Sequence, residues 1–313
     1  NQPTYNPNDR SQFSAERYRN RAITDIFEPG SSLKPLIVAA ALESGQYLPT
    51  SIVDTAPGFI VVGPKKIEDT RNLGRVSLTT ILARSSNVGI TKLAMTLQPD
   101  QLWDTMTQFG LGALTTSGFP GESAGMLTHY SNWRPISQAT LAYGYGISVT
   151  PLQLAQAYAA IGDDGTMHPI SLVALEQAGE GERVVGEDTA SAVRRMLEEV
   201  VRPGGTGTKA AIDGYRIAGK TGTAWKFATG GYSQDKYISI FAGMAPASDP
   251  RLATVVVIDE PTGELYYGSD VAAPVFADVM SESLRLLAVP PDDMPARDPG
   301  NVIQAMATRP EKQ

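Results

Sequence analysis

Several residue types are scarce or missing in this chain, and each absence narrows its chemistry. There is no cysteine, which excludes disulfides, thiolate metal sites and cysteine nucleophiles. The only histidines, His129 and His168, are far apart in the sequence, so we expect neither a metal site built on them nor a cofactor. The 26 basic residues are scattered and outnumbered by 33 acidic ones, and we therefore expect no nucleic-acid partner.

Long apolar runs are missing as well. No stretch approaches the roughly 18 consecutive apolar residues that a membrane-spanning helix requires, and no signal peptide opens the chain. As given, the chain is therefore expected to be soluble. It begins at Asn1 without a methionine, in a polar stretch that looks cut from something longer. Its 313 residues, 42% of them hydrophobic, suffice for one large domain or two smaller ones.

One segment near the start of the chain predicts a deeply buried helix. The pattern runs from Ser31 to Gln46, with Pro35 in the first turn, where a missing N–H costs little, and Gly45 at the end. Leu36 to Leu42 are seven apolar residues in succession. A helix that is apolar on every face is buried on every face, so this one should pass through the middle of the domain.

The rest of the chain divides into a helical part and a strand-rich part. Helices are predicted at 79–84, 99–109, 150–161 and 189–201, the third of them capped by Thr150. After about residue 210, strand-like runs at 215–217, 237–244 and 252–258 predict an antiparallel sheet, followed by a helix at 272–287. The proline-rich tail at 291–313 cannot build a core.

Three short motifs carry the candidate chemistry. Ser31 and Lys34 stand three residues apart at the start of the predicted helix, which places a hydroxyl and an amine on one face. An amine-activated serine nucleophile needs this arrangement, although Ser31 could equally be an N-cap residue. The pattern alone is weak because Ser233 and Lys236 repeat it, in what we interpret as a solvated polar loop.

The order of the motifs is more specific than any one of them. The S-x-x-K pattern is followed by Ser85-Ser86-Asn87 and then by Lys220-Thr221-Gly222. This trio in this order is characteristic of penicillin-binding proteins and class A β-lactamases. The sequence therefore favours an acyl-serine enzyme.

Two competing motifs lack the context that they need. Residues 214–221 satisfy the phosphate-binding pattern G-x-x-x-x-G-K-[ST], but no buried strand precedes them and no helix signal follows. Residues 121–125 match the nucleophile elbow G-x-S-x-G, but they follow Pro120 and continue into a loop. We reject both interpretations.

Several longer stretches resemble one family. They are Arg19–Asp25, Phe27–Ser31, Ser85–Gly89, Tyr143–Gly146, Tyr266–Gly268 and Ala273–Phe276. Together with the three motifs they resemble the class B penicillin-binding proteins of the septal (FtsI) type, and the resemblance extends to about residue 290.

The resemblance implies the fold. It is the α/β (α+β) penicillin-binding and serine β-lactamase-like fold, with a sheet of five antiparallel strands flanked by helices. Residues 1–290 would form the transpeptidase domain, with an inserted helical subdomain at about 50–205, and 291–313 a flexible tail. By this resemblance, the family's membrane anchor, pedestal domain and first two strands would lie upstream of this chain.

The resemblance also implies a peptidoglycan D,D-transpeptidase and assigns roles to its residues. Ser31 would be the nucleophile and Lys34 its base, while Ser85 relays a proton and Asn87 holds both Lys34 and the substrate. The backbone N–H groups of Ser31 and Thr223 would form an oxyanion hole. The substrate carboxylate would be bound by Lys220, Thr221, Gly222 and Thr223. Tyr266 and Tyr267 would form an aromatic wall, unless they are ordinary core aromatics.

The implied partners are a stem peptide ending in D-Ala-D-Ala, β-lactam antibiotics, a septal glycosyltransferase and the divisome membrane proteins. The enzyme would be anchored at the periplasmic face of the inner membrane. A D,D-carboxypeptidase and a non-catalytic penicillin-binding sensor share the same motifs and remain open. A class A β-lactamase is disfavoured because no glutamate at 122–199 has asparagine four residues later.

Overall fold

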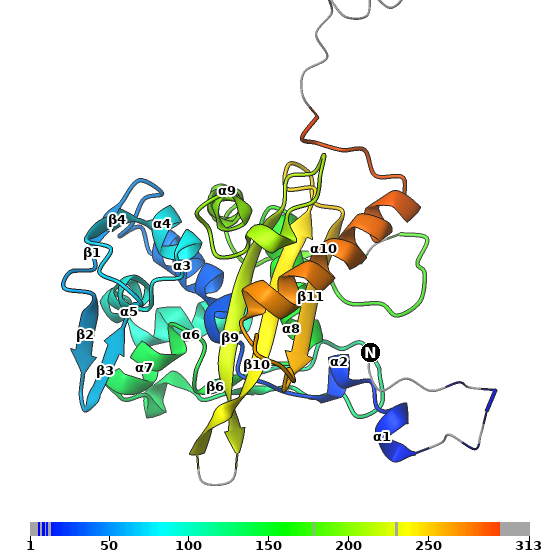
Figure 1. The fold of residues 1–313 in the computed structure, drawn as a ribbon, viewed down its shortest axis with the longest axis horizontal. Helices are drawn as coiled ribbons and strands as arrows, with labels where there is room; N and C mark the ends of the chain where they lie inside the picture. Colours follow the sequence, from blue (N-terminus) through cyan, green and yellow to red (C-terminus); the bar gives the residue numbers. More distant parts are fainter. Residues whose placement is uncertain are drawn as a thin grey trace, which may run out of the picture.

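A small antiparallel sheet organises the molecule, with helices on both of its faces. The computed structural model describes residues 14–177, 179–228 and 231–294, together with positions 6, 8, 9 and 11. The three strands lie in the order β11-β10-β9. Helix α10 crosses one face of this sheet, while α8 packs on the opposite face (Figure 1).

The helices and strands follow one another along the chain with short connections. The helices and 3-10 turns are α1 (Ala15–Tyr18), α2 (Arg21–Thr24), η2 (Gly30–Leu33), α3 (Lys34–Glu43), α4 (Leu78–Ala83), α5 (Asn87–Thr96), α6 (Pro99–Gln108), η3 (Tyr130–Asn132), α7 (Pro135–Leu141), α8 (Pro151–Gly162), α9 (Glu187–Val201), η4 (Thr208–Ala210) and α10 (Gly268–Leu286). The strands of the main sheet are β9 (Ala218–Ala228), β10 (Gly231–Ala245) and β11 (Leu252–Asp259). Four two-stranded pairs are formed by β1 (Ile52–Asp54) with β4 (Arg75–Ser77), β2 (Phe59–Val62) with β3 (Lys65–Glu68), β5 (Met126–Leu127) with β6 (Ile147–Ser148) and β7 (Thr166–Met167) with β8 (Glu182–Arg183).

Helix α3 occupies the centre of the helical half of the molecule, as its sequence predicts. Every residue from Lys34 to Ala41 is buried. The helix packs against α4, α5, α6 and α9, which surround it. Because apolar neighbours cover all of its faces, α3 is held rigidly and fixes the positions of the residues at its N-terminal end.

The two faces of the main sheet belong to two separate apolar cores. Ile240 and Ala242 on β10 pack with α3 and the other central helices, whereas Phe241 packs with Phe276 of α10. Successive strand residues point to opposite faces. Consequently Lys220, which pairs with Ala242, faces the helical half, and Thr221, which pairs with Phe241, faces the α10 side.

Most of the predicted elements are confirmed, and three predictions need correction. The helices predicted at 79–84, 99–109, 150–161 and 189–201 are α4, α6, α8 and α9, and Thr150 does cap α8. The run at 215–217 is not a strand; β9 begins at Ala218 and carries the third motif. The closing helix starts at Gly268 rather than at residue 272. The second S-x-x-K copy, from Ser233 to Lys236, lies in β10, at an irregularity in its pairing with β9, and not in a loop, although Asp235 and Lys236 are exposed as expected.

The resemblance implies five antiparallel strands, the first two of them upstream of this chain, and within the described residues the main sheet has the other three. Residues 295–313, most of the predicted tail, lie outside the described residues. Across the described part of the chain, no helix combines the length and apolar character needed to cross a membrane.

Candidate active site

The first motif begins in a tight turn and not in the α-helix itself. Ser31 lies in the 3-10 turn η2, and its carbonyl accepts a hydrogen bond from the backbone N–H of Lys34, the first residue of α3. The turn is fixed by its neighbours, because the Gly30 N–H donates to the Gly144 carbonyl at 3.1 Å. The Ser31 side chain remains half-buried at the edge of the core, where a ligand can approach it.

The amine of Lys34 joins the first motif to the second. It is fully buried and donates to the Ser85 carbonyl at 2.7 Å, to the Asn87 Oδ1 at 2.8 Å and to the Ser85 Oγ at 3.1 Å. An ammonium group has three N–H bonds and satisfies these three acceptors. When the amine is neutral, the Ser85 hydroxyl can donate to its lone pair instead, so a proton can pass between the two groups.

The second motif lies at the junction of α4 and α5. Ser85 has a φ of +56°, in the left-handed region that a residue with a side chain seldom adopts. Its neighbour Ser86 caps α5, since the Ser86 Oγ accepts a hydrogen bond from the Gly89 N–H at 2.8 Å. The sharp turn at Ser85 aims both its own hydroxyl and the amide of Asn87 at Lys34.

The third motif lies on β9, the edge strand beside the nucleophile turn. Lys220 is fully buried, and its amine donates to the Thr221 carbonyl at 3.1 Å. The hydroxyl of Thr221 lies 2.9 Å from that of Thr206, in the segment after α9. Thr223 lies against Gly30, because a β-carbon built on Gly30 would be 3.3 Å from the Thr223 carbonyl oxygen. The backbones of Ser31 and Thr223 are therefore neighbours, as an oxyanion hole between their N–H groups requires.

Burial sets the charge state of the two lysines. Burial, and then the positive charge of Lys220, hold the pKa of Lys34 well below its usual value, while the negative charge of Asp69 opposes the shift. Burial alone lowers the pKa of Lys220 to about 7. Desolvation disfavours a charged amine, and two amines close together disfavour each other's protonation. Lys34 therefore loses its proton more readily than an ordinary lysine and can act as a base.

Comparison with known proteins identifies the family of this chain. A family profile described as "Penicillin binding protein transpeptidase domain" matches residues 1–281. The chain belongs to that family. The peptidoglycan D,D-transpeptidase FtsI of Escherichia coli K12 is 45% identical over 298 residues, which are 95% of this chain and 50% of that protein. The probable peptidoglycan D,D-transpeptidase PenA of Neisseria flavescens is 43% identical over 93% of this chain and 72% of its own length.

A solved structure confirms the fold of this transpeptidase domain. The apo structure of the TP domain from Burkholderia pseudomallei penicillin-binding protein 3 superposes with a TM-score of 0.84 at 44% sequence identity. The match covers 89% of this chain and 84% of that one. The chain spans about half the length of most of the curated relatives it matches. The predicted fold class and family are thereby confirmed.

The two tyrosines of the predicted aromatic wall are tied to the third motif of the transpeptidase domain. Tyr266 stacks on Tyr237 of β10 with ring centroids 4.0 Å apart, and Tyr267 is 52% exposed beside it. The next residue, Gly268, donates its N–H to the Thr223 Oγ1 at 2.9 Å. A β-carbon on Gly268 would lie 2.2 Å from the Gly222 carbonyl oxygen, so only glycine permits this approach. Tyr267 is therefore held next to the strand of the third motif.

Two residues that the motifs do not include are bonded to motif residues, and a third, Glu28, lies three positions before Ser31. Thr206 is bonded to the Thr221 hydroxyl, and Asp69 accepts hydrogen bonds from the second motif. Glu28 accepts from the Gly146 N–H and the Tyr232 hydroxyl, and burial raises its pKa. Glu28 falls within a stretch that resembles the family, but nothing near Thr206 or Asp69 in the sequence indicates that they reach the site.

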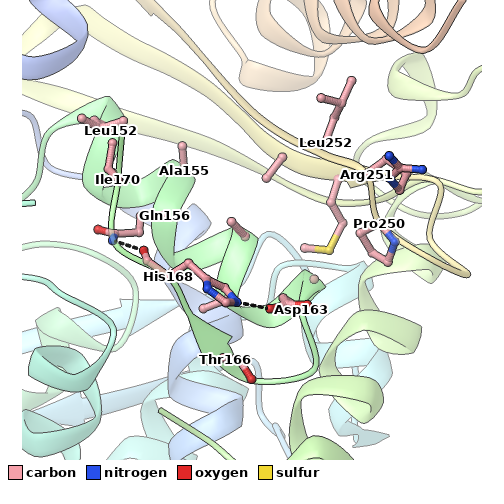
Figure 2. Close-up of a pocket in the computed structure, with 15 residues that line it drawn as sticks. Leu152, Ala155, Gln156, Asp163, Thr166, His168, Ile170, Pro250, Arg251 and Leu252 are labelled. Carbon is pink, nitrogen blue, oxygen red and sulfur yellow. Dashed lines mark hydrogen bonds and ion pairs between the residues drawn. The ribbon is translucent and has the colours of Figure 1, made fainter. Parts of the chain in front are cut away.

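A second hollow lies away from the motifs, between α8 and β11. It has a volume of about 530 Å³ and shares no lining residue with the three motifs. Figure 2 shows His168 on its wall with Nε2 directed at Asp163, at 2.9 Å. In the described part of the chain, no group of three or more histidine, aspartate or glutamate side chains is arranged to hold a metal ion.

Proposed function

We propose that this chain is the catalytic domain of a peptidoglycan D,D-transpeptidase that forms stem-peptide cross-links in septal wall synthesis. The observation that carries the proposal is the buried Lys34 amine, hydrogen-bonded to Ser85 and Asn87 and one helical turn from Ser31. Identity of 40–45% to FtsI, PenA and PbpC proteins supports the substrate class.

In the first step the Ser31 hydroxyl attacks the carbonyl carbon of the penultimate D-alanine. The proton of the hydroxyl passes to the neutral amine of Lys34, and a C–O bond forms. The C–N bond to the terminal D-alanine then breaks, and the leaving amine receives the proton through Ser85. D-alanine departs, and the stem peptide remains as an ester on Ser31.

The third motif binds the donor. Thr221 and Thr223, with Lys220 behind them, bind the terminal carboxylate, and Gly222 lets the strand lie close to it. The N–H groups of Ser31 and Thr223 stabilise the negative charge that develops on the attacked carbonyl oxygen. Each such donor contributes about 3 kcal/mol to lowering the barrier.

In the second step the amine of a neighbouring stem attacks the ester, and the proton that it loses returns to Ser31 through Lys34. A cross-link forms and the serine is regenerated. Tyr266 and Tyr267 provide an apolar wall along the acyl group. Penicillins acylate Ser31 because their strained amide takes the place of the D-Ala-D-Ala bond.

The remaining parts of the proposal follow from the family. Residues 1–290 are the transpeptidase domain, with 50–205 as its helical subdomain and 291–313 as a tail. The site works on the periplasmic face of the inner membrane, held there by an anchor and a pedestal domain of the longer protein. Its partners are a septal glycosyltransferase and the divisome membrane proteins.

Mass spectrometry with a labelled penicillin tests the chemistry. The wild type should form a long-lived adduct on Ser31, Ser31→Ala should form none, and Ser233→Ala, the matched control in the second S-x-x-K copy, should label like the wild type. Labelling that persists in Ser31→Ala would refute the assignment of Ser31 as the nucleophile. Rapid release of the label from the wild type would indicate a β-lactamase.

Product analysis with a stem pentapeptide separates the remaining functions. A transpeptidase should release D-alanine with formation of a dimer when an acceptor amine is present. Release of D-alanine with water as the sole acceptor would identify a D,D-carboxypeptidase. Stable labelling by penicillin without any release of D-alanine would identify a sensor.

A further inference from the structure

One carboxylate outside the three motifs is bonded directly to the second motif. Asp69 follows β3 and is half-buried. Its Oδ2 accepts from the Ser86 Oγ at 2.5 Å, and its Oδ1 accepts from the backbone N–H groups of Asn87 at 2.5 Å and Val88 at 3.0 Å. A single side chain thus binds two residues of the motif and the first turn of α5.

These bonds matter because the motif adopts an unfavourable backbone conformation. A residue with a side chain in the left-handed region costs on the order of 1 kcal/mol, so the conformation of Ser85 persists only if its flanks are fixed. On the α4 side, the Ser85 N–H donates to the Leu82 carbonyl at 3.1 Å. On the α5 side, Asp69 supplies the corresponding restraint through Asn87.

Asp69 itself is firmly held. Its N–H donates to the Gly58 carbonyl at 3.0 Å, at the start of the β2–β3 hairpin. The carbonyl of the preceding residue, Glu68, accepts from the Asn87 Nδ2 at 3.3 Å. The end of β3 therefore accepts hydrogen bonds from both the backbone N–H and the side-chain amide of Asn87. The Asn87 Oδ1 remains directed at Lys34.

Asp69 also acts on Lys34 by its charge. Two charged side chains influence the Lys34 amine, Lys220 from β9 and Asp69 from the end of β3, and they act in opposite directions. Lys220 favours loss of the proton, whereas Asp69 favours its retention. A change at Asp69 therefore alters both the geometry around Lys34 and the pH at which the amine becomes neutral.

We propose that Asp69 is a positioning residue for acyl transfer, which holds the second motif against Lys34 through its three hydrogen bonds. The proposal rests on the acyl-serine chemistry proposed above. Within the described part of the chain the Asp69 side chain bonds to Ser86, Asn87 and Val88 and not to Ser31; it acts by fixing Ser85 and Asn87, which do the proton transfer and the binding.

The test compares three variants by the rate of acylation with a fluorescent penicillin, measured as a function of pH. Asp69→Asn keeps the shape of the side chain and removes its charge. Ser86→Ala keeps the charge and removes one of the three hydrogen bonds to Asp69, together with the cap of α5. Ser77→Ala is the matched control, because Ser77 caps α4 by accepting a hydrogen bond from the Thr80 N–H at 3.2 Å. Thermal melts show what each change costs in stability.

We expect Asp69→Asn to reduce the maximal acylation rate about tenfold or more, and to move the acid limb of the pH profile to lower pH. Ser86→Ala should lose less, with an unmoved acid limb, and Ser77→Ala should lower the melting temperature only. An acid limb of Asp69→Asn that coincides with that of the wild type, or a rate loss in Ser77→Ala equal to that in Asp69→Asn, overturns the proposal. A wild type that does not label at all would overturn the acyl-serine chemistry instead, so the two failures are distinguishable.

Discussion

Replacement of Gly144 by alanine is the most direct test of how the nucleophile turn is held. A β-carbon at this position would lie 2.0 Å from the Gly30 carbonyl oxygen and 2.5 Å from the Gly30 nitrogen. Real β-carbons essentially never approach another atom within 3.0 Å, so the two segments must separate by roughly 1 Å. Since Gly30 precedes Ser31, this displacement moves the nucleophile.

The size of the effect follows from that displacement. A shift of about 1 Å in a reacting group can cost about 100-fold in rate, which corresponds to roughly 2.7 kcal/mol in the barrier. Stability should fall as well. Gly144 has a φ of +84°, which costs an alanine about 1 kcal/mol, and the Gly30 to Gly144 hydrogen bond contributes about another 1 kcal/mol.

Gly118→Ala is the matched control, because Gly118 has a φ of +72° and a β-carbon added there would meet no atom within 4 Å. It should lose stability by the backbone effect alone and be acylated at the wild-type rate. The assay is the acylation rate with fluorescent penicillin, beside thermal melts of all three proteins. Acylation of Gly144→Ala within about threefold of wild type would refute the proposed contact between these segments.

Two further predictions concern stability as a function of pH. Lys220 has its pKa lowered from 10.5 to about 7, so between these values the unfolded chain holds a proton that the folded chain lacks, and stability rises with pH. Lys220→Met should abolish acylation and should stabilise the fold at pH 7 by up to the order of 4 kcal/mol. It should also reduce the rise of the unfolding free energy with pH, as measured by urea unfolding from about pH 7 to 9.5. An unchanged pH dependence of stability would contradict the argument. The Gly179 carbonyl and then Asp163 raise the pKa of His168 in the folded protein. The protonated side chain therefore contributes fully to the folding stability below the pKa of the unfolded chain, and this contribution disappears as the pH rises through the pKa of the folded protein. Because the His168 side chain is 43% exposed, His168→Gln should cost less than about 1 kcal/mol at about pH 5.5 and nothing at about pH 8.5; an equal loss at both values would refute the assignment.

Local features of the fold were easier to predict from the sequence than long-range ones. The burial of α3 followed from seven apolar residues in succession, and the start of α8 after Thr150 followed from a capping residue and a proline. The start of β9 was missed because Gly219 and Gly222 lack the side chains that identify a strand. Here, tertiary packing against Phe241 and Ile240 favours glycine, so the local pattern is misleading.

Prediction of the site from the sequence has the same limit: local patterns are informative and long-range contacts are not. Motif order predicted that Lys34, Ser85 and Asn87 lie together, and the structure does place them in contact. No comparable signal exists for Asp69 or Thr206, which are single polar residues in ordinary surroundings. They reach the motifs only because the β2–β3 hairpin and the segment after α9 fold back onto α5 and β9, and that is a property of the topology.

The complete burial of α3 has a consequence for the dynamics of the domain. Backbone amides exchange with solvent only when a segment opens, and a helix enclosed on every side cannot open without disrupting the helices around it. The amides of α3 should therefore exchange at the rate of global unfolding, while those of the exposed β2–β3 hairpin exchange through local fluctuations. Any change that destabilises the domain as a whole would then appear first as faster hydrogen exchange directly behind Ser31, the residue on which the chemistry depends.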